Sequence, residues 1–159
     1  MALGMVFQLP EKDETSISRK QMLACLDISM GGRVAEELIF GESKVTSGAS
    51  NDLQQATNLA RAMVTKYGMS KQVGVVTDNY DDNGRSVSTE TRLLIKQEIK
   101  EFLERACNNA KTILTTNCKE LHARANALLE HERLTGVRSR PCLLSQKSEK
   151  QFGSGEYYA

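Results

Sequence analysis

The sequence of 159 residues has no tryptophan, two prolines, two histidines and no excess of one charge, with 21 Lys+Arg against 20 Asp+Glu. This charge balance gives no electrostatic reason to expect nucleic acid or an anionic membrane surface as a partner. No apolar run reaches the length of about 18 residues that a membrane span needs. A self-contained zinc hydrolase usually places two or three histidines on the metal. Because only His122 and His131 occur, and neither lies in an HExxH motif, the composition alone argues against a complete catalytic zinc site.

The cysteines are few and scattered. Cys25, Cys107, Cys118 and Cys142 form no CxxC pair, which excludes a zinc ribbon and favours reduced thiols in a reducing compartment. Apolar residues make up 40% of the sequence and charged residues 26%, a balance typical of one soluble globular domain. The first residues are apolar but lack a basic segment before them and a cleavage pattern, so no targeting peptide is predicted.

Helical periodicity dominates what is present. Apolar residues recur every three or four positions over 18–40, 51–67, 89–115 and 119–132, which predicts four α-helices. The short break at Asn117 predicts an antiparallel hairpin of the last two helices. Residues 1–9 alternate loosely and stop at Pro10, which predicts a short strand. The fold class is therefore mainly α with a short N-terminal β-strand, and residues 137–159, which show no period, are predicted to be a disordered tail.

Two details depart from this pattern. Gly31 and Gly32 stand inside the first predicted helix, where each costs about 1 kcal/mol relative to alanine. They require either the close approach of another backbone or a kink. The acidic stretch 78–84 is similar to a calcium loop, but the twelfth position, which is Glu in an EF-hand, is Thr89 here. A solvated surface turn is therefore the favoured interpretation.

The most unusual local sequence is the small-residue loop Thr46-Ser47-Gly48-Ala49-Ser50-Asn51-Asp52, which leads into the second predicted helix. Asn51, followed by Gln54 three residues later, resembles a capping box. Asp52 falls in the first helical turn, where a carboxylate gains roughly a few tenths of a kcal/mol from the helix dipole. The alternative is a zinc ligand beside two histidines, since carboxylate oxygens bind zinc. Spacing alone favours the dipole interpretation.

Three separated motifs nevertheless resemble those of one known family, and they occur in the same order. They are Gly31-Gly32-Arg33-Val34-Ala35-Glu36-Glu37-Leu38-Ile39-Phe40-Gly41, then Thr46-Ser47-Gly48-Ala49-Ser50-Asn51-Asp52-Leu53, and Ala62-Met63-Val64-Thr65-Lys66-Tyr67-Gly68-Met69-Ser70. Together they closely resemble the peptidase domain of FtsH-type AAA proteases, which are membrane-anchored, ATP-dependent zinc metalloproteases. Residues 78–84 and 88–95 look most like the plant mitochondrial i-AAA branch. The resemblance covers residues 1–136.

The resemblance implies roles for particular residues. Asp52 matches the third zinc ligand of the family. Glu36 matches an acidic position near the zinc, where it would orient a ligating histidine by accepting its other N–H. The plain alternative for Glu36 is a solvated helix face. The segment Leu3, Gly4, Met5 and Val6 matches the strand expected to pair with an extended substrate. Such pairing uses main-chain hydrogen bonds and therefore suits many unfolded substrates.

The sequence also departs from the family. No HExxH occurs, and the resemblance places that motif before Met1, so no residue of the sequence is assigned as the catalytic base. His131-Glu132-Arg133-Leu134-Thr135 begins like HExxH but ends in threonine. The phosphate-binding GxxxxGK[ST] motif of the ATPase module does not occur either. Beyond Gly136 the sequence diverges, so the predicted organisation is a partial peptidase domain over 1–136 and a divergent tail over 137–159.

The implied function is that of an ATP-dependent zinc metalloendopeptidase in membrane protein quality control, with this chain a fragment inactive by itself. In the complete family protein, the resemblance implies zinc and ATP as cofactors, unfolded or membrane proteins as substrates, a hexamer and the mitochondrial inner membrane. A different class is a non-catalytic helical module that assembles with full-length family members. A third interpretation is a product that does not fold stably.

Overall fold

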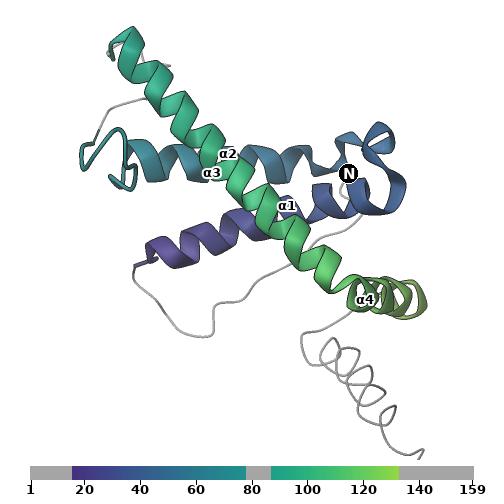
Figure 1. The fold of residues 1–159 in the computed structure, drawn as a ribbon. Coiled ribbons are helices and arrows are strands. Elements are labelled where there is room, and N and C mark those ends of the chain that lie inside the picture. Colours follow the sequence, from purple (N-terminus) through teal and green to yellow (C-terminus); the bar gives the residue numbers. More distant parts are fainter. Residues whose placement is uncertain (1–15, 78–86, 133–159) are drawn as a thin grey trace, which may run out of the picture.

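The computed structural model describes residues 16–77 and 87–132. In chain order the helices are α1 (Arg19–Phe40), α2 (Ser50–Thr65), α3 (Thr89–Thr116) and α4 (Cys118–His131), with two short 3-10 helices, η1 (Glu42–Lys44) and η2 (Ser47–Ala49), between α1 and α2 (Figure 1). The mainly helical fold class is thus confirmed. The described residues contain no strand, and both the predicted strand over 1–9 and the tail over 137–159 lie outside them.

Local sequence fixes where α1 begins and ends. Ser18 accepts a hydrogen bond from the backbone N–H of Gln21, and the Gln21 side chain reaches back to Ser18, which completes a capping box. After Phe40, Gly41 takes a φ of +84°, a conformation that side chains with a Cβ rarely adopt. The helix predicted over 18–40 is therefore confirmed, with Ser18 as its N-cap and Gly41 as its C-cap.

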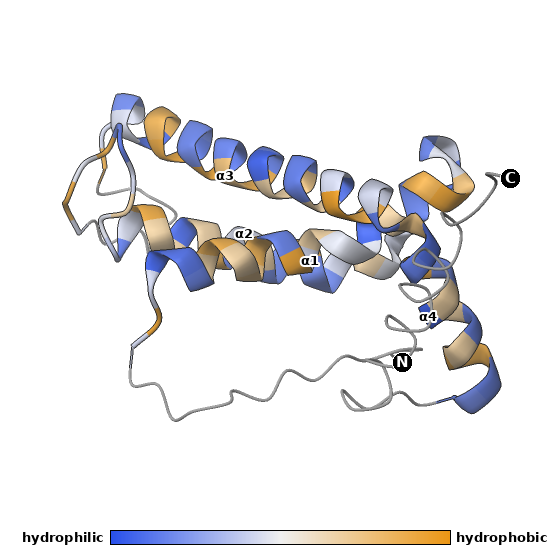
Figure 2. Cartoon of the chain, turned by 60° about the horizontal axis from the view of Figure 1, so that its bottom comes forward, coloured by the Kyte–Doolittle hydropathy of each residue, from blue (hydrophilic) through white to orange (hydrophobic). Residues whose placement is uncertain are grey.

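The helices α1, α2 and α3 form one three-helix body, in which α3 lies across the other two (Figure 1). Their apolar faces meet in a single core, and Figure 2 shows polar residues on the outward side of α3. The core side chains of α1 recur every four residues, as the sequence period predicts. The buried core consists of Met22, Leu26, Met30, Val34, Ala56, Ala60, Met63, Val64, Ile95, Phe102, Ala106 and Ala110.

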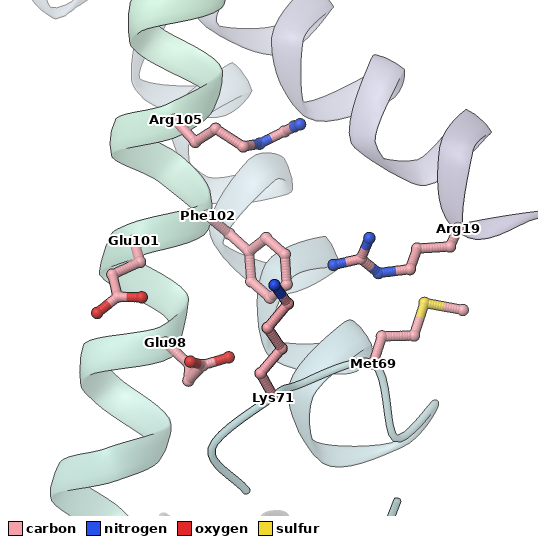
Figure 3. A pocket seen from close by; sticks show the side chains of 7 residues that line it. All are labelled: Arg19, Met69, Lys71, Glu98, Glu101, Phe102 and Arg105. Atoms are coloured by element: carbon pink, nitrogen blue, oxygen red, sulfur yellow. The ribbon is translucent and has the colours of Figure 1, made fainter. Parts of the chain in front are cut away.

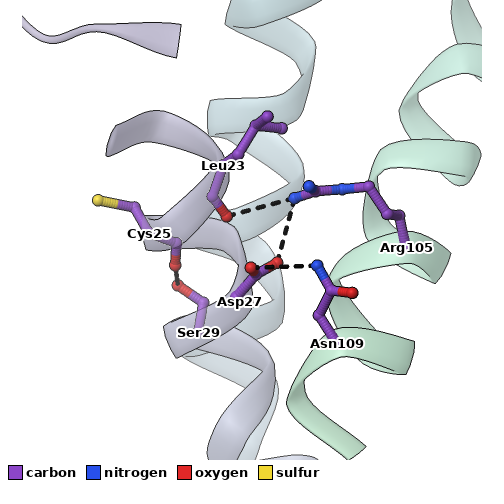
Figure 4. A network of polar contacts seen from close by, with 6 residues as sticks. All are labelled: Leu23, Cys25, Asp27, Ser29, Arg105 and Asn109. Atoms are coloured by element: carbon purple, nitrogen blue, oxygen red, sulfur yellow. Dashed lines mark hydrogen bonds and ion pairs between the residues drawn. The ribbon is translucent and has the colours of Figure 1, made fainter. Parts of the chain in front are cut away.

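A polar network ties α3 to α1 beside this core (Figure 4). The Arg105 guanidinium donates to Asp27 Oδ1 at 3.1 Å and to the Leu23 carbonyl at 3.4 Å, while Asn109 donates to Asp27 Oδ2 at 3.3 Å. Both Asp27 oxygens are therefore used across the interface. Further along α3, Lys111 Nζ lies 3.0 Å from Glu37 Oε1, and this hydrogen bond together with the Glu37 charge raises the pKa of Lys111.

The segment after α2 is held to α3 through a buried carboxylate. Glu98 is 6% exposed, and its Oε2 accepts a hydrogen bond of 2.8 Å from Ser70 Oγ. The same Oγ accepts from the backbone N–H groups of Gln72 and Val73. Ser70 thereby satisfies a buried charge and fixes the turn that follows α2.

The fourth helix does not form the expected antiparallel hairpin. Among the described elements α4 contacts only α3, and it has no buried residue. Figure 2 shows α4 turning away from the end of α3 instead of running back along it. Leu128 and Leu129 remain 46% and 83% exposed. The hairpin prediction was wrong because a short interhelical break permits several crossing directions, and the apolar stripe of α4 has no partner within the described residues.

The close approach of another backbone does not explain the glycine pair in α1. Helix α1 continues without interruption through both residues. A Cβ at Gly31 would meet nothing within 4 Å, and one at Gly32 would meet only Asp52 Oδ2, at 3.8 Å. No backbone of the described residues therefore approaches either position closely, and Gly32 instead faces a carboxylate of α2.

Candidate metal site

Asp52 lies in the first turn of α2 and is exposed. Its Oδ2 is directed toward α1, because a Cβ built on Gly32 would stand 3.8 Å from it. Within residues 16–77 and 87–132, no hydrogen bond or ion pair engages the Asp52 side chain. The carboxylate is thus available at a rigid helix start, as a metal ligand requires.

The start of α2 is set by a different residue from the one predicted. The N-cap of α2 is Ala49, which makes no side-chain cap, and Asn51 lies inside the helix, so the capping box of Asn51 and Gln54 is not formed. Instead, Thr46 caps η2 by accepting from the Gly48 N–H, and η2 runs directly into α2. The capping prediction was wrong because the helical turn begins earlier, in the small-residue loop.

Glu36 fastens this loop to α1. Its Oε2 accepts from the Thr46 backbone N–H at 2.8 Å, and both carboxylate oxygens lie 3.1 Å from Thr46 Oγ1. Gly48 is close by, since a Cβ there would be 3.2 Å from Thr46 Oγ1 and 3.5 Å from Glu36 Oε1. The spacing of the motifs did not point to Thr46, because the ten residues that separate it from Glu36 belong to no regular period.

Asp52 and Glu36 belong to one neighbourhood. Gly32 and Glu36 are four residues apart in α1 and therefore share one helix face. Asp52 lies beside Gly32, and the loop that precedes α2 is bonded to Glu36. The fold thus brings into one neighbourhood the two residues that the resemblance predicts to lie near a metal. The predicted substrate residues Leu3, Gly4, Met5 and Val6 lie outside the described residues.

The described residues hold no complete set of metal ligands around Asp52. Nowhere in 16–77 and 87–132 do three or more His, Cys, Asp or Glu residues gather as a metal site would require. His122 and His131 both belong to α4, which makes no contact with α2. The His122 Nδ1 lies 2.8 Å from the Cys118 carbonyl of its own helix. Asp52 fits a zinc site whose other ligands come from elsewhere.

A cavity of about 200 Å³ opens near the beginning of α1 (Figure 3). In it the Arg19 guanidinium carbon stands 5.9 Å from the Phe102 ring centroid. With a rise of about 1.5 Å per residue, Arg19 is about 25 Å along α1 from Glu36, so this cavity is separate from the candidate metal site. The lining residues are Arg19, Met69, Lys71, Glu98, Glu101, Phe102 and Arg105.

Comparison with known families gives a match over most of the chain. The chain matches peptidase family M41 over residues 1–140. Since this match covers most of its length, the chain belongs to peptidase family M41. The resemblance to FtsH-type proteases is thereby confirmed.

Individual relatives carry the same description. The chain is 49% identical over 137 residues to an "ATP-dependent zinc metalloprotease FtsH" of Neorickettsia risticii, covering 85% of this chain and 22% of that protein. It is 54% identical over 134 residues to "ATP-dependent zinc metalloprotease FTSH 9, chloroplastic/mitochondrial" of rice, covering 84% and 16%. It is 48% identical over 147 residues to "ATP-dependent zinc metalloprotease YME1L1" of mouse, covering 92% and 20%. The chain therefore spans about a fifth of the length of these relatives.

No helix in the described part of the chain is both long and apolar enough to cross a membrane.

Proposed function

We propose that this chain forms the helical body of an ATP-dependent zinc metalloendopeptidase and that Asp52 supplies a carboxylate ligand to the zinc. The observation that carries the proposal is the exposed Asp52 carboxylate at the start of α2. In a member of family M41, that position favours a metal ligand over a simple interaction with the helix dipole.

When bound, zinc would polarise the scissile carbonyl of the substrate and activate a water molecule. The residues of this chain would supply one ligand, the Asp52 carboxylate, and hold it in position. Asp52 is held beside Gly32 of α1, and the loop before α2 is bonded to Glu36. Glu36 also keeps its proposed role toward a zinc-bound histidine. Since HExxH does not occur in the 159 residues, two histidines and a general base must come from outside them.

The same reasoning extends to substrates and assembly. The segment Leu3, Gly4, Met5 and Val6 is proposed to pair with extended, unfolded or membrane-derived protein substrates. The relatives named as mitochondrial or chloroplastic support a mitochondrial setting, with the inner membrane as the proposed site. A hexamer with family members, driven by ATP through a separate module, is proposed for the complete protein.

The test uses a full-length FtsH relative in which residues 1–136 of this chain replace the corresponding segment. Asp52→Asn should lower zinc affinity by more than the roughly 10–100-fold typical of outer-shell partners and should abolish ATP-dependent hydrolysis of casein. The control, Glu42→Gln, changes another exposed acidic residue near the loop and should leave zinc retention and hydrolysis unchanged. Unchanged zinc retention in Asp52→Asn would refute the proposal.

The 159-residue chain by itself should bind zinc weakly and should not hydrolyse casein, because it supplies one proposed ligand and no HExxH. Calorimetry and a caseinolysis assay test this expectation. Stoichiometric zinc at micromolar affinity, together with hydrolysis that Asp52→Ala abolishes, would contradict it.

A non-catalytic assembly module is the second candidate function. The observation that favours it is α4, which has no buried residue and exposes Leu128 and Leu129. Size-exclusion chromatography with light scattering, with and without a full-length relative, distinguishes the two. A strict monomer that also fails to join the full-length ring would argue against the module.

A further inference from the structure

The loop between α1 and α2 is joined to α1 by more than its chain connection. The Glu36 carboxylate, four residues before the end of α1, accepts from both the N–H and the hydroxyl of Thr46. Hydrogen bonds to an ionised group are roughly twice as strong as those between neutral groups. The orientation in which the Thr46 hydroxyl donates its proton to the Glu36 carboxylate is therefore energetically favoured.

That orientation leaves the Thr46 oxygen free to accept from the next turn. Gly48 N–H donates to Thr46 Oγ1 at 3.2 Å, and Ser50 N–H donates to the Ser47 carbonyl to close η2. Helix α2 follows at once, with Asp52 in its first turn. One hydroxyl thus links Glu36 of α1 to the turn that begins α2.

We infer that Glu36, Thr46 and Gly48 form a clamp in which Thr46 is a positioning residue for Asp52. Thr46 touches neither substrate nor metal in this inference, and it acts through the direction in which α2 begins. Gly48 is part of the clamp because a Cβ there would crowd Thr46 Oγ1 at 3.2 Å. The inference rests on the proposed function only where it gives Asp52 a metal to bind.

The experiment compares Thr46→Val, which keeps the shape and removes the hydroxyl, with Thr46→Ser, which retains it. Amide hydrogen exchange and 13C shifts are measured by NMR on the 159-residue chain. Thr46→Val should speed exchange at Gly48 and Ser50 about tenfold, as expected for the loss of a hydrogen-bond chain that ends on a charged group. The backbone and carboxyl resonances of Asp52 should shift as well. Thr46→Ser should restore both.

Matched controls separate local from global effects. Thr112→Val removes a hydroxyl that bonds only within α3, to the Asn108 carbonyl, and should change neither readout. Glu36→Gln should speed exchange of the Thr46 amide. By contrast, Glu37→Gln removes a carboxylate that is bonded to Lys111 and should leave the loop unchanged.

Several outcomes would overturn the clamp. In Thr46→Val, these are an unchanged exchange rate at the Gly48 amide, an equal acceleration of exchange at the buried core residue Val64, or unchanged Asp52 resonances. In Thr46→Ser, the contradicting outcome is failure to restore the exchange rates and resonances of the original chain. None of these measurements requires zinc. If the clamp holds while Asp52→Asn leaves zinc retention unchanged in the full-length protein, the proposed function fails and the clamp stands as an anchor of the loop.

Discussion

At the scale of single residues, two glycines differ in the space that a Cβ would find around them. Gly31 lies within α1 with open space where a Cβ would be. Gly68 follows α2 with a φ of +58°, and a Cβ there would approach the Cα of Val75 to 3.1 Å. The first glycine carries the entropic cost of a flexible residue within a helix, whereas the second takes a conformation that other residues rarely adopt.

Alanine at these two positions should therefore change stability in opposite directions. Gly31→Ala is expected to raise the free energy of unfolding by about 0.5–1 kcal/mol. Gly68→Ala is expected to lower it by about 1 kcal/mol or more, because αL strain and crowding against Val75 add. Urea unfolding followed by circular dichroism measures both. A destabilised Gly31→Ala would contradict the open space seen at that position.

At the scale of elements, the spans of the helices were readable from sequence, whereas the cap of α2 and the contacts between elements were not. Ser18 with Gln21 is a local pattern, and Gly41 needs only its own backbone angles. The bond from Thr46 to Glu36 joins a loop to a helix, and no sequence period records such a pair. The hairpin of α3 and α4 was mispredicted for the same reason, since periodicity identifies an apolar face without naming its partner.

The contact between the post-α2 turn and α3 supplies a prediction at this scale. Ser70→Ala should lower the free energy of unfolding by about 1–3 kcal/mol, because it removes the partner of a buried carboxylate. Ser29→Ala is the control, since Ser29 Oγ bonds only to the Cys25 carbonyl of its own helix. Chemical denaturation of both variants is the measurement. Equal effects would show that Glu98 does not depend on Ser70.

At the scale of the whole molecule, three helices share a core and α4 stands apart from it. The buried side chains of the core come from α1, α2 and α3. Helix α4 contributes none and contacts only α3 among the described elements. Stability should accordingly be concentrated in the first three helices, with little contribution from α4.

Two leucine truncations test this division. Leu26 is fully buried, so Leu26→Ala should cost about 2–5 kcal/mol through lost burial and the cavity left behind. Leu129 is 83% exposed, so Leu129→Ala should change the free energy of unfolding by no more than about 0.5 kcal/mol. Thermal and urea unfolding of the 159-residue chain measure both. A large loss in Leu129→Ala would place α4 within the cooperative unit.

The sequence by itself determined the helical spans, their apolar faces and the family, because period and motif order are local or one-dimensional properties. It also singled out Asp52, with the preference for a zinc ligand coming from the resemblance, and Glu36, through the resemblance alone. The tertiary structure decided what surrounds them. It placed Asp52 beside Gly32, joined Glu36 to Thr46 and directed α4 away from the core. These features depend on how helices cross and where a loop folds back, and such long-range geometry leaves no period in the chain.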